Sequence, residues 1–338
     1  MNSENTTEGI ASGKEMALFH LPGLFEFNDF YSAFLPLYAG HREWFLDFCE
    51  IASVYGAPEG CIWGGGRTGS GRADPEKVLR LFNGYGISAR LTFSNSLLRK
   101  EHLSDKDCNR LCRLFADTGF FMEHGTCDIP ADALNNMTDG DIPELQKKRN
   151  GVIVHSELLT DYLRENYPDL YLVSSTTKVI TDFDGFIREA EREEFDYIVP
   201  DFRLNKEYER LSGLPAGIKD KVEFLCNECC FFGCADRKAC YENVSAKNLG
   251  ADCVAHVCRA PGGSRGYRFS EAMRNPGFIG IGDIRDIYLP MGFSNFKIEG
   301  RELGSALVLE FILHYLTKPE YALNVREEIY LDSMLDLF

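Results

Sequence analysis

The sequence lacks an apolar run long enough to cross a membrane. A membrane-spanning helix needs roughly 18 successive apolar residues, whereas the most apolar stretch, residues 306–316, is interrupted by Glu310 and His314. The chain begins MNSENTTEGIASGKE, which has no apolar segment of the kind found in secretory signals. We therefore expect a cytoplasmic protein without membrane contacts, and a disordered leader over residues 1–14.

Basic residues are scarce relative to acidic ones. The 338 residues include 36 Lys and Arg against 52 Asp and Glu, which gives a formal net charge of −16. Affinity for nucleic acid comes mainly from neutralisation of phosphates by Lys and Arg, so nucleic acid is not an expected partner. An acidic surface is compatible with a partner subunit, but no segment of the sequence locates an interface.

Several common enzyme signatures are also missing. The sequence contains no G-x-S-x-G and no H-E-x-x-H, so ordinary serine or zinc hydrolysis is poorly supported. The glycine-rich segment GCIWGGGR, from Gly60 to Arg67, does not fit G-x-G-x-x-G followed by an apolar helix. It predicts a strand that runs into a glycine turn, and not a dinucleotide site.

Short apolar strands alternate with helices of about ten residues along much of the chain. We predict one or two helices within residues 25–54, and strands at residues 16–21, 60–67, 87–93, 151–154, 170–173, 197–199, 222–225, 278–281 and 295–298. Such alternation is typical of parallel βα units. At this length, and with 44% hydrophobic residues, it favours a TIM-barrel-like (β/α)8 barrel over residues 15–318, in one large domain.

Two further features concern helix ends and the C-terminus. Asp74 is expected to cap a helix that starts at Pro75, and Ser104 with Asp107 to form the capping box of a helix over residues 104–116. The helical tail at residues 319–338 fits either a docking helix or the last helix of the outer ring of the barrel.

Cysteines are crowded into one loop, residues 226–258, which follows the apolar strand at 222–225. It holds Cys226, Cys229, Cys230, Cys234, Cys240, Cys253 and Cys258, out of 12 cysteines in the chain. A disulfide framework is not expected in a reducing compartment. Thiolates at short, uneven spacings suit zinc or an iron–sulfur cluster. Two alternatives stay open: small buried hydrophobic residues, and a redox-active CxxC pair at Cys226 and Cys229.

Polar residues at strand ends are the catalytic candidates, because the chemistry of such barrels gathers there. They are Asp201, Glu228, Lys297 and Glu299. Strand alternation directs Lys297 and Glu299 inward, where an interior ion pair that only stabilises the barrel is an equal alternative. His20 and His155 are expected to be satisfied core histidines. The run from Ser174 to Thr177 fits either an anion cradle or a helix cap.

Several segments carry a resemblance to a known family. FSNFKIEGRELGSAL from Phe293 resembles the FKIEGR signature of the collagenase-like (U-32) peptidases. NECCFFGCADRKACY from Asn227 is similar to a subgroup that reads approximately N-E-x-C-x3-C-x2-R-x2-H-Y, and GVIVHS, YPDLYLVSST and IVPDFRLN agree with it. The chain departs from the family in two places. It lacks the cysteine that the main branch has shortly before FKIEGR, and Cys240 stands where the subgroup has histidine.

The resemblance implies a 4Fe-4S enzyme of TIM-barrel type, since better understood relatives support hydroxylation without dioxygen. Carried onto this chain, it implies thiolate ligands at Cys230, Cys234 and Cys240, which fit the loop of the subgroup. Cys258 is our choice for the remote fourth ligand, and Cys226, Cys229 and Cys253 stay open as competing ligands. Arg237, which follows the cysteines, is expected either to bind an anionic substrate or cofactor or to cover the cluster, and Asn227 is a candidate contact to the cofactor. The alternative is a peptidase-like or peptide-binding barrel that is stabilised by zinc and has no redox chemistry.

Overall fold

A computed structural model describes residues 13–65, 71–117, 149–261, 263, 266–300 and 302–334, with side chains to residue 330. The first twelve residues of the expected leader lie outside this part. Lys14 already belongs to the fold: its backbone N–H donates to the carbonyl of Leu289 at 2.8 Å, and its amine pairs with Asp220 at 2.7 Å.

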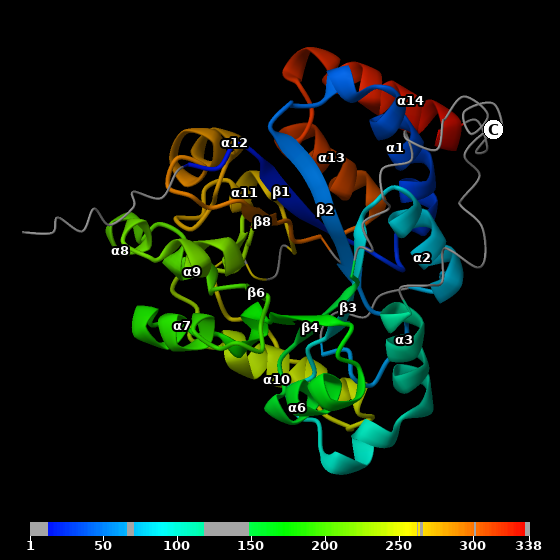
Figure 1. Cartoon of the computed structure of the whole chain (residues 1–338), viewed down its shortest axis with the longest axis vertical. Helices are drawn as coiled ribbons and strands as arrows, with labels where there is room; N and C mark the ends of the chain where they lie inside the picture. Colours follow the sequence, from blue (N-terminus) through cyan, green and yellow to red (C-terminus); the bar gives the residue numbers. More distant parts are fainter. Residues whose placement is uncertain are drawn as a thin grey trace, which may run out of the picture.

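Eight parallel strands form one sheet in the order β6-β5-β4-β3-β2-β1-β8-β7. They are β1 (Ala17–Pro22), β2 (Cys49–Gly56), β3 (Ser88–Phe93), β4 (Gly151–Val154), β5 (Tyr171–Ser174), β6 (Tyr197–Ile198), β7 (Glu223–Leu225) and β8 (Asn295–Lys297). The end strands β6 and β7 meet through a parallel bridge between Ile198 and Val222. The sheet therefore closes almost completely, and the predicted (β/α)8 barrel is confirmed (Figure 1).

Helices cover the strands, most of them on the outside of the barrel, as Figure 1 shows. The longer ones are α1 (Asn28–Gly40), α2 (Pro75–Gly84), α3 (Lys106–Ala116), α6 (Glu157–Asn166), α7 (Phe183–Ala190), α10 (Arg237–Asn248), α13 (Ser305–Tyr315) and α14 (Ala322–Met334). Short ones are α8 (Tyr208–Ser212), α9 (Ala216–Lys221), α11 (Phe269–Ala272) and α12 (Ile281–Asp283). In the C-terminal tail, α14 packs against α1 and α13, which is the position of a last outer helix.

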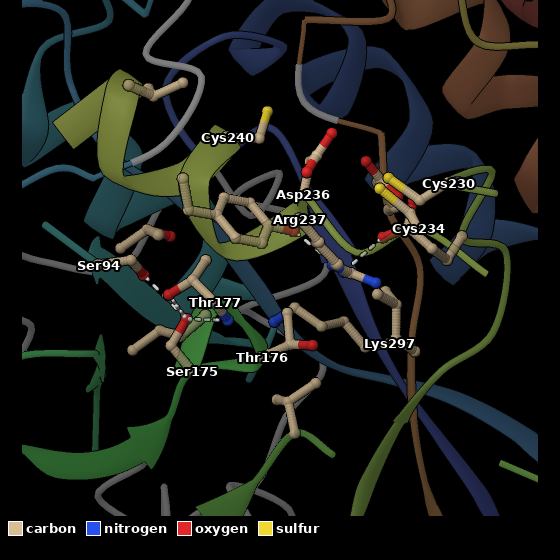
Figure 2. A pocket seen from close by; sticks show the side chains of 18 of the residues that line it. Ser94, Ser175, Thr176, Thr177, Cys230, Cys234, Asp236, Arg237, Cys240 and Lys297 are labelled. Atoms are coloured by element: carbon tan, nitrogen blue, oxygen red, sulfur yellow. Dashed lines mark hydrogen bonds and ion pairs between the residues drawn. The ribbon is translucent and has the colours of Figure 1, made fainter. Parts of the chain in front are cut away.

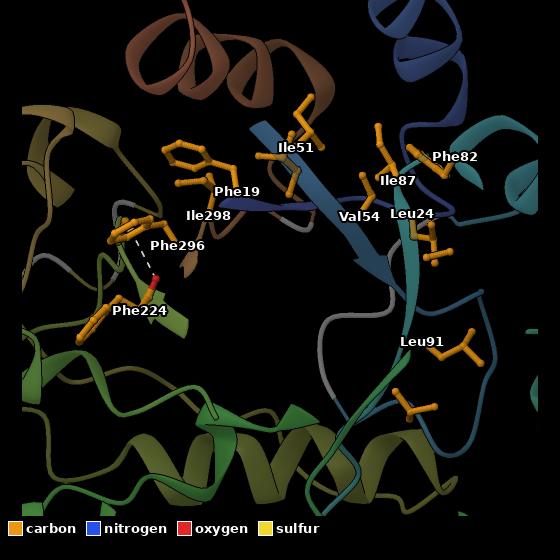
Figure 3. Packing of buried hydrophobic residues seen from close by; sticks show 14 of the residues in the cluster. Phe19, Leu24, Ile51, Val54, Phe82, Ile87, Leu91, Phe224, Phe296 and Ile298 are labelled. Carbon is orange, nitrogen blue, oxygen red and sulfur yellow. Dashed lines mark hydrogen bonds between the residues drawn. The ribbon is translucent and has the colours of Figure 1, made fainter. Parts of the chain in front are cut away.

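The larger hydrophobic core lies between the strands and the outer helices. Phe19, Val54, Phe224 and Phe296 are buried there, on strands that come from distant parts of the chain (Figure 3). A smaller cluster lies inside the barrel and consists of Tyr55, Ile153, Tyr171, Val173, Val199 and Leu225. Because side chains alternate along a strand, one face of a strand points to the outer core and the other points into the barrel.

Three predicted strands or helices differ from the structure. The segment at 25–54 contains α1 but ends in strand β2, so the reading as helices alone was wrong. Residues 60–65 form turns and not a strand, and Arg67 lies outside the described residues. Gly65 is pressed so closely against Ser94 and Asn95 that a Cβ atom would lie 2.0 Å from the Asn95 nitrogen, so no side chain fits.

The third difference is at residues 278–281, where no strand forms. A backbone hydrogen bond from Ile279 N–H to the carbonyl of Cys226, at 3.0 Å, instead holds the segment beside the residue that follows β7. None of the helices in the described part combines the length and apolar character needed to cross a membrane.

Candidate functional site

A cavity of about 150 Å³ lies at the carboxyl ends of the barrel strands (Figure 2). Its lower wall comes from residues at or just beyond strand ends: Tyr55, Thr92, Ser94, Ile153, Ser175, Thr176, Thr177, Val199, Leu225, Glu228, Lys297 and Glu299. Its other wall comes from the cysteine loop and α10, through Cys230, Cys234, Asp236, Arg237, Cys240, Tyr241, Val244, His256 and Cys258. The site is therefore where a barrel of this kind places its chemistry.

Helix α10 is held across this mouth by hydrogen bonds to the loops that follow β2 and β3. Asn95 donates to the carbonyl of Ser245 at 3.2 Å, and the Ser245 hydroxyl accepts from the backbone N–H of Ser96 at 3.2 Å. Asn248, at the end of the helix, donates to the carbonyl of Gly64. The helix thus covers the cavity as a fixed part of the fold.

The interior of the barrel beneath the cavity is charged. Glu223 is fully buried and pairs with Arg90 and, at 3.1 Å, with the amine of Lys297. Burial favours the neutral carboxyl, but the charges of Arg90 and Lys297 and the hydrogen bond from Arg90 together act against it, and the pKa of Glu223 lies below its usual range. Lys297 also lies 3.6 Å from the centroid of the Tyr55 ring. Lys297 thus forms an interior ion pair, which was one of its two predicted roles, and the partner of Lys297 in this pair is Glu223.

A buried carboxylate and guanidinium network forms the side of the cavity next to the cysteine loop. Glu228 accepts from Arg237 Nη2 at 2.6 Å and from the backbone N–H of Cys230 at 2.9 Å. The carboxyl of Glu299 also lines the cavity and affects the pKa of Glu228. Burial alone would raise the pKa of Glu228, but the charge of Arg237 and the hydrogen bond from the Cys230 backbone N–H together contribute to lowering it on balance. Two carboxyls and one guanidinium are therefore held together in a place with little access to water.

Arg237 has hydrogen-bonding capacity left over. It is 3% exposed, and among the described residues its Nε and Nη1 atoms have no hydrogen-bond partner; the carboxylate of Asp201 lies 3.7 Å from Nη1. The rings of Phe202 and Tyr241 lie 4.7 and 5.5 Å from the guanidinium carbon. The hydroxyl of Thr92, also on the cavity wall and 3% exposed, likewise lacks a partner within the described part. Buried polar groups are normally satisfied, so both groups fit a polar ligand in the cavity.

Hydroxyl groups line the wall at β3 and β5. The Ser175 hydroxyl lies 3.2 Å from that of Ser94 and 2.9 Å from that of Thr177, as Figure 2 shows. Thr177 in turn contacts His155 Nδ1 at 2.8 Å. Burial, with the charge of Lys178, lowers the pKa of His155 to about 4. Ser175 also accepts a hydrogen bond from the backbone N–H of Thr177. The same residues therefore form both the helix cap and part of the cavity wall.

The structure separates the seven crowded cysteines into two groups. Cys230, Cys234, Cys240 and Cys258 line the cavity. Cys226 points into the outer core, where its thiol donates to the carbonyl of Phe224 at 3.4 Å and burial raises its pKa. Cys253 accepts from the side chain of Asn243 at 3.7 Å, and neither it nor Cys229 lines the cavity.

The four thiols share the cavity without forming a ready-made cage for one ion. Within the residues that the structure describes, no three His, Cys, Asp or Glu side chains are gathered closely enough to hold a metal ion. In Figure 2, Cys230 and Cys234 lie on one side of the cavity and Cys240 lies on α10. Burial, with the charge of Glu228, raises the pKa of the Cys230 thiol.

The remaining predicted residues divide between the cavity and its support. Glu228, Lys297, Glu299 and Arg237 line the cavity. Asp201 does not, because its carboxylate is bound by Arg203 at 2.6 Å. The amide of Asn227 joins the ends of β7 and β8: it accepts from Glu299 N–H at 2.7 Å and donates to Glu299 O at 3.0 Å. Arg301, the last residue of FKIEGR, lies outside the described residues.

Sequence reasoning missed Arg90, Glu223, Thr92 and Tyr241. A signal existed for three of them. In SARLTF the polar residues Ser88, Arg90 and Thr92 alternate with apolar ones, and Glu223 interrupts an apolar strand. Period-two polarity on strands that are covered outside by helices marks the interior of a barrel.

Comparison with known proteins adds little beyond the fold. No protein-family model matches the sequence, and no curated protein matches it at a significant level. A solved structure described as the U32 peptidase Mk0906 is similar in fold, with a TM-score of 0.47 and 14% sequence identity, over 89% of this chain and 99% of that one.

Proposed function

We propose that this chain is an iron–sulfur enzyme that resembles the U-32 peptidases and that uses its barrel-mouth cavity for redox modification of a substrate, such as hydroxylation without dioxygen. The observation that carries the proposal is that Cys230, Cys234, Cys240 and Cys258 line one cavity, although they come from three separate stretches of the loop. Scattered buried cysteines would have no reason to converge on the carboxyl ends of the barrel.

The donor set fits a 4Fe-4S cluster in chemical type, because such clusters are held by four cysteine thiolates. The four thiolates of a cluster bind four different iron atoms, so they stand further apart than four ligands of a single zinc ion. Bound there, the cluster would supply one-electron transfer. The FKIEGR strand supports the same proposal by resemblance, since its Lys297 and Glu299 both line the cavity.

The other cavity residues would bind and orient the substrate. Nε and Nη1 of Arg237 and the Thr92 hydroxyl offer hydrogen bonds to polar atoms, while Ile153, Val199 and Leu225 provide apolar contact. The carboxyl oxygens of Glu228 and Glu299, which line the cavity, can accept hydrogen bonds from a bound group. A volume of about 150 Å³ admits a small molecule or one ring of a larger one.

The test is to measure iron, sulfide and visible absorption on protein purified without oxygen. We expect brown protein with about four irons per chain, and loss of iron and colour when Cys230, Cys234, Cys240 or Cys258 is changed to Ser. Cys253→Ser is the matched control, because Cys253 belongs to the same loop but does not line the cavity. It should keep the iron.

Two results would contradict the proposal. Colourless protein with about one zinc per chain would favour the zinc-stabilised, non-redox alternative, in which a closed four-coordinate site leaves no open position for chemistry. Iron that is lost equally in Cys253→Ser and in the four cavity variants would show that the cavity thiols are not its specific ligands.

A further inference from the structure

Three buried cysteines gather at a second place, away from the cavity. Cys61 lies in the turn region after β2, and Cys108 and Cys112 lie one turn apart on α3. The Cys61 and Cys108 sulfur atoms are 3.5 Å apart and are not joined by a disulfide. None of the three lines the cavity, so they belong to no part of the site already described.

The electrostatics make this pair asymmetric. The hydrogen bond from Cys108 lowers the pKa of Cys61, and backbone N–H groups of Gly64 and Trp63 act in the same direction. The same hydrogen bond, together with burial, raises the pKa of Cys108. Burial, with the charge of Cys61, raises the pKa of Cys112. Cys61 is therefore the thiol most ready to act as a thiolate, which is the nucleophilic form, and Cys108 is the thiol within its reach.

The segment that carries Cys61 is bonded to three other parts of the fold. Asn95 after β3 donates to the carbonyl of Ile62 at 3.0 Å, and Trp63 Nε1 donates to the carbonyl of His102 at 2.8 Å. The carbonyl of Gly64 accepts from Asn248 at the end of α10. A covalent bond from Cys61 to α3 would thus fix the segment to which α10, the helix over the cavity, is hydrogen-bonded.

We propose that Cys61 and Cys108 form a reversible disulfide in response to peroxide. The Cys61 thiolate attacks one oxygen of hydrogen peroxide, the O–O bond breaks, and a sulfenic acid and hydroxide form. The Cys108 sulfur then attacks the sulfenic sulfur, the S–O bond breaks, and the S–S bond forms. The hydroxide that leaves the sulfenic sulfur takes up the Cys108 proton, and the hydroxide from the first step takes up the proton that Cys61 had released. Two thiols are thus oxidised by two electrons, and one peroxide is reduced to two waters.

Access and geometry both permit this reaction. Cys61 is 7% exposed, which suits a small oxidant better than a bulky disulfide. The sulfur atoms need to approach by about 1.5 Å to reach the length of an S–S bond. The proposal goes beyond the cavity chemistry and does not depend on it.

The test is peptide mapping of the full-length protein before and after treatment with hydrogen peroxide, with free thiols alkylated before digestion. We expect a cross-linked peptide joining Cys61 to Cys108, absent before treatment and lost on reduction with dithiothreitol. Cys61→Ser and Cys108→Ser should abolish this cross-link. Cys112→Ser is the matched control and should retain it, since Cys112 belongs to the same cluster but is not the partner.

Alkylation of both Cys61 and Cys108 after peroxide treatment of the wild type would overturn the proposal, as would a cross-link from Cys61 to Cys112. Because the wild-type map decides this, the outcome does not depend on whether a serine variant folds. As a second measurement, peroxide should raise the thermal midpoint of the wild type by a few degrees relative to Cys61→Ser, because the bond restricts the unfolded chain.

Discussion

His20 shows how the interior of the barrel treats a titratable group. It is fully buried, with Nδ1 2.7 Å from the Ser53 hydroxyl and Nε2 3.3 Å from the Asn295 side-chain oxygen. Glu223 lies 3.5 Å from Nε2 and would favour a proton, but burial and the charge of Arg90 lower the pKa of His20 to about 3. The native state therefore keeps this imidazole neutral at neutral pH.

This burial predicts a loss of stability on acidification. Because the folded pKa is lowered from 6.5, the unfolded chain binds the proton first, so the stabilisation is complete above about pH 6.5 and falls as the pH drops toward 3. At pH 5 the loss due to His20 is about 2 kcal/mol relative to pH 7. We expect His20→Asn to reduce the difference in the free energy of unfolding between pH 7 and pH 5 by that amount, measured by urea titration.

The comparison is made within each protein, so any overall destabilisation by the substitution cancels. His155→Gln should flatten the same profile over a narrower range, since the pKa of His155 is about 4. An unchanged difference between pH 7 and pH 5 in His20→Asn would show that His20 does not titrate as described.

At the scale of single elements, helix α3 illustrates how a cap is chosen. The sequence has three possible capping residues within four positions, Ser104, Asp105 and Asp107, and we predicted a capping box from Ser104 and Asp107. The structure instead caps α3 with Asp105, whose carboxylate accepts from Cys108 N–H at 2.8 Å. Ser104 ends a 3-10 helix (Lys100–Ser104), and its hydroxyl donates to the carbonyl of Glu101. The preceding turn thus displaces the cap by one residue.

This correction can be tested by a matched pair of substitutions. Asp105→Ala should lower the free energy of unfolding by about 1 kcal/mol, because it leaves an N–H group at the start of the helix without its acceptor. Ser104→Ala should change it by less than about 0.5 kcal/mol, as is usual at exposed positions. Chemical denaturation at neutral pH measures both. A larger loss in Ser104→Ala than in Asp105→Ala would restore the original interpretation.

At the scale of the whole molecule, the barrel has one weak seam. Strands β1 and β2 pair over six residue positions, whereas β6 and β7 meet only at the Ile198–Val222 bridge. Strand β6 has just two residues and pairs with β5 at two positions. Few hydrogen bonds and a short strand mean that local opening costs least here.

We expect hydrogen exchange to report this seam directly. Among the strand-bearing peptides, those covering residues 195–200 and 220–225 should exchange before those covering 17–22 and 49–56, in native conditions. Mass spectrometry after timed exposure to deuterated water measures the order. Earlier exchange in the β1 and β2 peptides would place the weakest part of the barrel elsewhere.

The sequence by itself determined the class of fold, because alternation of short apolar strands with helices is a local pattern. It also marked the residues at strand ends, since parallel strands bring these to one edge. In residues 49–56 the spacing of the apolar residues fits both the period of a helix and that of a strand. The sequence was therefore ambiguous there, and the strand was missed. In the structure this segment is strand β2, which pairs with β1 on one side and with β3 on the other.

Only the tertiary structure decided which polar groups meet. Glu223 pairs with Arg90 and Lys297 from strands that are far apart in sequence. Likewise, spacing alone left seven cysteines as candidate ligands, and only the closure of the barrel and the course of α10 separate the four that line the cavity from the others. The physical reason is that burial and side-chain contacts depend on which distant segments pack together. The residues next to a position in the sequence do not predict this packing.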